Sequence, residues 1–164
     1  MKIRDLLLTL AGLAIGFASP TFAQQTNTPD PQLREQIVAL LRKVDDVFNN
    51  NDPAALAPLY TEDAVVVAPE GPVYGREAIA KFWVDVFQKV RFSNHLLTLD
   101  QYSPHMIGTS GIEMWATAGF RQTTEGLNLG NGYLSVILVR EGDVSKFRLF
   151  AITAEPPGEA AQKQ

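Results

Sequence analysis

Two histidines, His95 and His105, are the only ones in the chain, and there is no cysteine. An imidazole exchanges protons near neutral pH, so a histidine is the first candidate for acid–base chemistry. The two are ten residues apart, with no HExxH or other paired ligand spacing, so we expect no metal site. Without cysteine, thiol nucleophiles, thiolate metal ligands and disulfides are excluded.

His95 lies in the strand-like segment "FSNHLLTLDQY". Strand alternation places it on one face with Ser93, Leu97 and Leu99. The other face then carries Phe92, Asn94, Leu96, Thr98 and Asp100. Among leucines on a covered face, His95 is either a general acid or base or a core histidine bonded to a backbone carbonyl. Only Asp100 and Arg121 are expected as charged partners, and alternation turns Asp100 away from His95.

Aromatic side chains are the second candidate set, because an aromatic-lined cavity with a few polar handles can orient a small apolar ligand. Seven of them should converge from helix faces and strands: Phe48, Tyr60, Trp83, Phe87, Trp115, Phe120 and Tyr133. They either fill the core or line a ligand pocket. No cofactor is predicted, since "GNGY" (130–133) lacks the third glycine of a dinucleotide fingerprint and no P-loop exists. Nor is "GTSGI" (108–112) a nucleophile elbow, because Ile112 stands where the motif needs its second glycine.

Periodicity predicts the elements that must position these residues. Apolar residues at helical spacing predict a helix over 31–50, with Asp30 as N-cap and Pro31 at its first position. A short second helix follows in "PAALAPLY", and a third starts after Gly75. Residues 64–68 and "VYG" form a hairpin around "PEGP", and four longer strands follow. Three helices followed by consecutive strands indicate an α+β fold with an antiparallel meander.

The N-terminus reads as a secretory signal peptide. Lys2 and Arg4 precede the apolar run "LLLTLAGLAIGFA", and small residues precede a cleavage site after Ala23. A membrane anchor or an N-terminal core helix is the alternative. We therefore expect a signal peptide over 1–23, a linker over 24–30, one domain over 31–155 and a polar tail over 156–164. The protein would be periplasmic or secreted, with no membrane attachment after cleavage.

The charge balance limits the partners. The net charge is −4 and no cluster of Lys or Arg occurs, which argues against nucleic acid and anionic membrane surfaces. The outer face of the strands still carries apolar residues. In "VSKFRLFAI", alternation places Val144, Phe150 and Ile152 on one face and Phe147, Leu149 and Ala151 on the other. Because both faces are partly apolar, we expect a homodimer.

The stretch "NNNDPAALAPLYTEDAVVVAPEGPVYGREAIAKFW" resembles the SnoaL-like and ketosteroid-isomerase-like branch of the nuclear transport factor 2-like superfamily. The positions that carry the resemblance are Asp52, Leu59, Tyr60, Asp63, Ala64, Gly75, Arg76 and Ile79. The resemblance implies a cystatin-like roll, in which a cone-shaped, curved, antiparallel-rich sheet wraps around three N-terminal helices and an apolar pocket. It also implies frequent dimerisation through the outer sheet surface. It is specific for fold and weak for function, because this fold hosts many activities.

The isomerase chemistry of that branch needs a carboxylate base, a tyrosine and a protonated acid. The matching positions here hold Val44, Ala68 and, on a looser alignment, Ser135. None of these side chains can supply the missing group, so this mechanism is not expected. Other branches use a His with an Asp, or an Arg with two Asp residues.

Two functions from different classes follow. The favoured one is an exported domain that binds a small hydrophobic molecule without chemistry of its own. The alternative is an isomerase, cyclase, dehydratase or hydrolase acting on a hydrophobic or polyketide-like substrate. His95 would be its acid or base, and Tyr60 or Tyr133 would orient the substrate.

Overall fold

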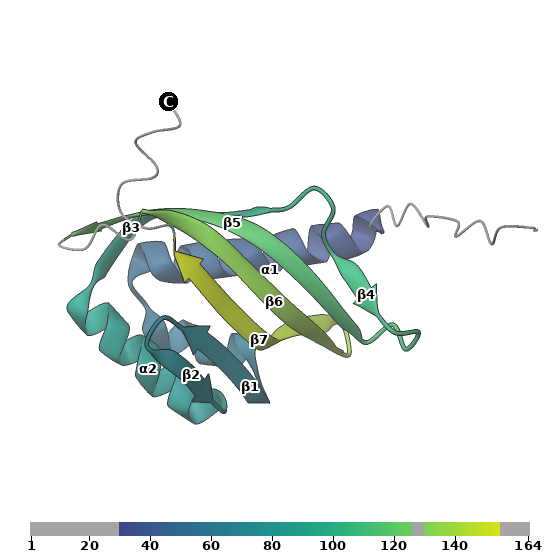
Figure 1. The fold of residues 1–164 in the computed structure, drawn as a ribbon, viewed down its shortest axis with the longest axis horizontal. Coiled ribbons are helices and arrows are strands. Elements are labelled where there is room, and N and C mark those ends of the chain that lie inside the picture. Colours follow the sequence, from purple (N-terminus) through teal and green to yellow (C-terminus); the bar gives the residue numbers. More distant parts are fainter. Residues whose placement is uncertain (1–29, 126–129, 155–164) are drawn as a thin grey trace, which may run out of the picture.

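A computed structural model describes residues 30–125 and 130–154 of the chain (Figure 1). The predicted signal peptide, nearly all of the predicted linker and the predicted tail lie outside the described residues. Among the residues that are described, no helix has both the length and the apolar character needed to cross a bilayer.

Helix α1 (Pro31–Asn50) has the predicted bounds and cap. The Asp30 side chain accepts a hydrogen bond from the Gln32 amide at 2.9 Å, and Pro31 occupies the first turn. The helix ends at Asn51, which adopts the left-handed conformation with φ 54°. One stripe of the helix is buried, comprising Ile37, Leu40, Leu41, Val44, Asp45, Val47 and Phe48.

The predicted short second helix is present as two single 3-10 turns, η1 (Pro53–Ala55) and η2 (Ala57–Leu59), and not as one continuous helix. Pro58 has no amide hydrogen to donate to the residue four positions earlier, so a regular α-helix cannot propagate through this short segment. The predicted third helix is α2 (Arg76–Lys89), which begins directly after Gly75.

The strands form one seven-stranded sheet in the order β2-β1-β7-β6-β5-β3, with β4 paired to β5. Their bounds are β1 (Tyr60–Ala68), β2 (Gly71–Tyr74), β3 (Arg91–Leu99), β4 (His105–Ile107), β5 (Glu113–Glu125), β6 (Asn131–Glu141) and β7 (Val144–Ala154). The predicted meander is present in β5, β6 and β7, which pair antiparallel. Strand β1 joins β7 in parallel, so the N-terminal hairpin extends the same sheet.

Two bulges change which side chains face inward. The β3–β5 register shifts between Ser93 and Leu96, and Asn94 there has φ 53°. Phe92 and His95 are consequently both buried, so the prediction that they occupy opposite faces is wrong. A second shift in the β6–β7 register, between Ile137 and Leu138, leaves Phe147 and Phe150 both buried. They too were expected on opposite faces. An unbroken alternation cannot anticipate either inserted residue.

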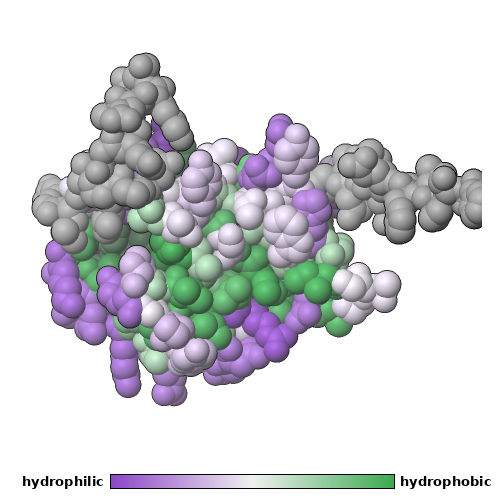
Figure 2. Space-filling model, in the orientation of Figure 1, coloured by the Kyte–Doolittle hydropathy of each residue, from purple (hydrophilic) through white to green (hydrophobic). Residues whose placement is uncertain are grey.

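The sheet curves over α1, and α2 lies beside the β1–β2 hairpin at one end (Figure 1). The buried faces of both helices and the inner side chains of the sheet form one hydrophobic core. The outer face of the sheet is turned toward the viewer in Figure 2, where hydrophobic residues form a band over β7 and its neighbours. The α+β class and the curved, antiparallel-rich sheet expected from the sequence are therefore confirmed.

Candidate active site

A buried carboxylate–imidazole pair lies between α1 and β3. Asp45 Oδ1 is 2.8 Å from His95 Nδ1, and both residues are buried. The same oxygen accepts the Leu97 amide at 2.9 Å. Because Oδ1 is already an acceptor, the shared hydrogen belongs to Nδ1, and Nε2 of the neutral ring is left as an acceptor. The pair therefore fixes both the tautomer and the orientation of the imidazole.

The sequence did not lead to Asp45 as the partner of His95, although the position of Asp45 in its helix could have indicated a buried carboxylate. Asp45 is four residues after Leu41 and three before Phe48, so it lies within the apolar stripe of the first helix. A carboxylate on a buried helix face requires a hydrogen-bond partner. Which residue provides that partner depends on the packing of α1 against β3, fifty residues further along the chain.

The backbone around His95 is held by two asparagines from the end of α1. Asn49 donates to the His95 carbonyl at 2.9 Å and accepts the His95 amide at 2.7 Å. Asn51 makes the same pair of bonds with Phe92, at 2.9 Å to the carbonyl and 3.0 Å from the amide. These four bonds flank the bulge at Ser93 and Asn94, where regular pairing with β5 is interrupted. They replace lost strand pairing and hold the bulge that turns His95 inward.

Aromatic packing fixes the plane of the imidazole. The Phe48 ring stacks on His95 with centroids 4.3 Å apart and an interplanar angle of 23°. Phe48 also contacts Trp83, Phe87 and Phe92 at 4.9 to 5.3 Å between ring centroids. The imidazole is thus held by Asp45 at one nitrogen and by an aromatic cluster on one face.

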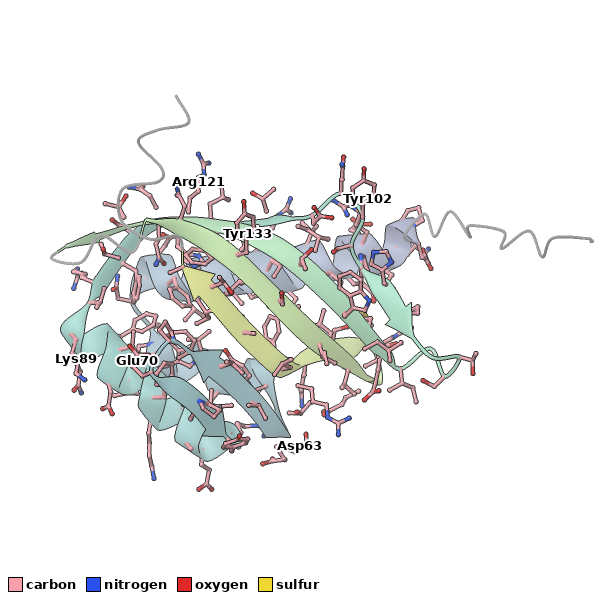
Figure 3. All side chains as sticks on the ribbon, viewed as in Figure 1. Asp63, Glu70, Lys89, Tyr102, Arg121 and Tyr133 are labelled. Carbon is pink, nitrogen blue, oxygen red and sulfur yellow. The ribbon has the colours of Figure 1, made fainter. Side chains whose placement is uncertain are left out.

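The ring borders a cavity of about 140 Å³ that is partly open to solvent. Six aromatic side chains line it, namely Phe48, Phe82, Trp83, Phe92, Phe120 and Phe150. Among the described residues of the lining, Glu70, His95 and Gln122 carry ionisable or amide side chains. Glu70 belongs to the β1–β2 turn, which lies beside α2 (Figure 3).

His95 Nε2 has access to open space beside the ring. Within the described part of the chain, the ring makes a hydrogen bond only through Nδ1. Every fully buried side-chain nitrogen or oxygen among those residues has a partner, so Nε2 must border open space. His95 lines this cavity and also a second hollow that it shares with Leu96 and Arg121, so an occupant of either can approach the imidazole.

The structure brings Phe48, Trp83 and Phe120 of the predicted pocket set to the cavity wall, together with His95. Phe87 is half-buried and packs behind Phe48 without lining the cavity. Tyr60 is fully buried in the core, where its hydroxyl accepts the Trp83 Nε1 hydrogen at 3.2 Å. Burial raises the pKa of Tyr60, so it stays a neutral structural phenol.

Trp115 and Tyr133 were also expected in the pocket, and here the expectation is wrong. They lie on the outer face of the sheet, 42% and 58% exposed, and Tyr133 projects from that face in Figure 3. Both positions alternate with buried neighbours that point inward, and aromatic character alone does not reveal which face of a strand a residue occupies. Tyr60 and Tyr133, the two tyrosines expected to orient a substrate, therefore do not line the cavity.

The other expected polar groups do not join His95. Asp100 is exposed beyond the end of β3, and Arg121 projects outward from β5 (Figure 3). His105 stacks on Trp115 at 4.4 Å, far from the pair formed by Asp45 and His95 in the fold. Among residues 30–125 and 130–154, no three His, Asp or Glu side chains form a group that could hold a metal ion.

The positions tested for isomerase chemistry stay without the required groups. Val44 is buried in the core, and Ala68 lines the cavity where a carboxylate base would be needed. Ser135 points to the outer face, between the inward Leu134 and Val136. The proton-transfer groups in the described lining of this cavity are the buried His95 and the exposed Glu70.

A family model for the SnoaL-like domain matches residues 41–145. The chain belongs to the SnoaL-like family. This places it in the nuclear transport factor 2-like superfamily, as the sequence motif suggested. The match begins four residues before Asp45 and includes His95, so this SnoaL-like domain contains the whole pair.

Solved structures agree on the fold. A cystatin-like domain of unknown function from Nostoc punctiforme is 15% identical, with a TM-score of 0.64 over 82% of this chain and 84% of that one. A protein from Novosphingobium aromaticivorans with the provisional name scytalone dehydratase is 17% identical, with a TM-score of 0.61 over 76% and 85%. At such identities the likeness establishes the fold alone. Comparison with functionally curated proteins finds no sequence match.

Proposed function

We propose that this SnoaL-like domain is an acid–base enzyme that moves a proton on a small hydrophobic substrate held in the cavity. The observation that carries the proposal is the 2.8 Å contact between Asp45 and His95 at the wall of an apolar cavity. The sequence favoured a binder without chemistry because it revealed no proton-transfer pair. With the pair in the structure, that reason no longer holds.

In this proposal, His95 Nε2 removes a proton from the substrate and becomes part of an imidazolium. Asp45 accepts the Nδ1 hydrogen bond throughout, and its negative charge stabilises the imidazolium. The same Nε2 then returns the proton to another atom of the substrate. Return to a second carbon gives an isomerisation, and return to a departing hydroxyl releases water and gives a dehydration. Such a positioned base accelerates a reaction by about 10²- to 10⁴-fold.

Solvent exchange tests this proposal without knowledge of the natural substrate. Cyclohexanone is a small, uncharged ring with exchangeable hydrogens beside its carbonyl, and NMR in D₂O follows their replacement by deuterium. Wild-type protein should accelerate exchange over buffer. His95→Gln should lower the protein-dependent rate by about 10²-fold or more. The matched control is His105→Gln, which changes the second histidine of the chain, outside the cavity. Deuterium exchange into cyclohexanone should proceed at the wild-type rate with this variant.

Asp45→Asn probes the second member of the pair. An asparagine oxygen can still accept from Nδ1 and from the Leu97 amide, so the geometry is retained while the charge is lost. In a serine protease, the corresponding change of the aspartate also leaves the geometry intact, and it lowers kcat by about 10⁴-fold because the catalytic histidine takes the wrong tautomer. Equal exchange rates for wild type, His95→Gln and Asp45→Asn would contradict the enzyme proposal.

The second candidate function is ligand binding without chemistry. The mostly apolar lining favours it, since such a wall offers few donors that could stabilise an enolate oxygen. Binding of a small ring compound with no protein-dependent exchange would support this candidate. Export of the protein remains a separate proposal, tested by the N-terminal mass of protein recovered from the periplasm or medium of a bacterial host.

A further inference from the structure

The size, charge and polar contacts of the cavity restrict its occupant to a narrow chemical class. We infer that the cavity of this SnoaL-like domain takes an uncharged compound with a single six-membered ring, whose hydroxyl or acidic C–H group faces His95 Nε2. This inference rests on the proposed function because it names the substrate class of the same site. It excludes the fused-ring compounds expected from a polyketide-like substrate.

The volume of the cavity limits the size of its occupant. The cavity measures about 140 Å³. An engineered cavity of roughly 150 Å³, lined by Leu, Ile and Phe, stays dry and binds benzene. The two spaces are similar in size and lining, so one ring with small substituents fits. A second fused ring would exceed this volume, and Phe120 and Leu134 in the wall are buried, at 6% and 4% exposure.

The shape of the wall supports a flat ring. Six aromatic side chains surround the space, and aromatic rings favour edge-to-face or offset contacts with another ring. Around Phe48 these contacts already occur within the wall, with interplanar angles of 60° to 78° to Trp83, Phe87 and Phe92. A single aromatic or unsaturated ring can continue this packing without opening it.

The charged residues around the cavity limit the charge of its occupant. None of the described residues that line the cavity is Lys or Arg, whereas Glu70 is one of them. The buried carboxylate of Asp45 lies directly behind His95. A carboxylate or phosphate on the ligand would therefore meet negative groups and would be desolvated without a cationic partner. The site favours a neutral ligand.

The polar contact follows from the tautomer of His95. When Nδ1 of the neutral ring donates to Asp45, Nε2 offers a lone pair and no hydrogen. The ligand must then supply the donor, as a hydroxyl does. This is also the proton that His95 would remove in the proposed reaction, so the binding contact and the chemical step use the same atom.

Isothermal titration calorimetry with four commercially available ring compounds tests the inference. The protein used begins after residue 23. Phenol fits all the requirements, benzoate adds a negative charge, toluene lacks the donor, and 2-naphthol adds a ring. We expect benzoate and 2-naphthol to bind at least about 10-fold more weakly than phenol. The naphthol result is diagnostic, because its larger apolar surface would otherwise strengthen binding. Binding of 2-naphthol or benzoate as tight as that of phenol would overturn the inference.

Variants locate the binding at this cavity. Leu134→Ala enlarges the cavity wall and should improve 2-naphthol binding about 10-fold. Leu138→Ala is the matched control, since Leu138 is buried on the same face of the same strand and does not line the cavity. If Leu134→Ala does not fold, Ile152→Ala enlarges the wall at a half-buried position. Equal improvement by Leu138→Ala would refute the assignment to this cavity.

His95→Phe tests the polar contact while it preserves an aromatic ring against Phe48. It should weaken phenol by about 10-fold, the effect of losing a hydrogen bond, and should leave toluene binding unchanged or tighter. An equal loss for both ligands would contradict the contact with Nε2. The binding measurements and the deuterium-exchange measurements can fail independently of each other. Selective phenol binding without deuterium exchange would refute only the chemistry, and exchange without ring-size selectivity would refute only the substrate class.

Discussion

Gly132 provides a sharp test of the packing around the cavity. It lies on β6 opposite Phe120 of β5 and next to β7. A methyl group at this position would overlap the Thr153 carbonyl oxygen and lie 2.5 Å from Cζ of the Phe120 ring. The carbonyl belongs to a paired strand and cannot rotate away, so both the sheet and the Phe120 wall of the cavity would have to shift.

Gly119 is the matched control on the neighbouring strand. A methyl group there has the Gly132 carbonyl oxygen as its nearest neighbour, at 4.0 Å, which is an ordinary contact. Both Gly→Ala substitutions reduce the freedom of the unfolded chain similarly, which stabilises a protein by ~0.4–1 kcal/mol at a compatible site. Gly119→Ala should therefore be neutral or stabilising. Gly132→Ala adds an overpacking cost of ~1–3 kcal/mol. The two variants should differ in free energy of unfolding by about 2 kcal/mol.

Urea unfolding followed by tryptophan fluorescence measures this difference, and an unchanged m-value shows that only stability has changed. Phe120→Leu removes the ring atoms that the new methyl would meet. In the double variant, we expect part of the cost of Gly132→Ala to disappear, by about 1 kcal/mol relative to the sum of the single changes. Unfolding free energies of Gly119→Ala and Gly132→Ala within 0.5 kcal/mol, the ordinary error of additivity, would refute this account of the packing.

Two further predictions concern the sheet. Asn51→Gly keeps the left-handed backbone and removes the two hydrogen bonds to Phe92, so it should lower the free energy of unfolding by ~1–3 kcal/mol. The control is Asn94→Gly, at a similar positive φ, which should lower the free energy of unfolding by less than half as much. A comparable loss in both would show that the bonds to Phe92 contribute little. We also expect a homodimer through the outer face, and Tyr133→Arg should shift its mass in light scattering toward the monomer without changing the unfolding of the subunit. A wild-type monomer at micromolar concentration would contradict the dimer.

Local sequence was sufficient for the elements with strong periodicity. Helix α1 has the predicted bounds because its apolar repeat, its Asp30 cap and its Pro31 all act within a few residues of each other. The motif that resembles the SnoaL-like branch led to the correct family and to a curved sheet around an apolar interior. His95 and Phe48 could be selected as site residues for the same reason, since each stands out against its own element.

The partner of His95 and the inward side of each strand needed the tertiary structure. Alternation assumes an unbroken strand, whereas the bulges in β3 and β7 reverse the faces beyond them. The β3 bulge is held by Asn49 and Asn51, which come from a helix more than forty residues earlier. The sequence by itself indicated that an imidazole would lie on a covered face of a strand. Only the packing of α1 on β3 decided that Asp45 would bind it, because that contact joins residues far apart in the chain.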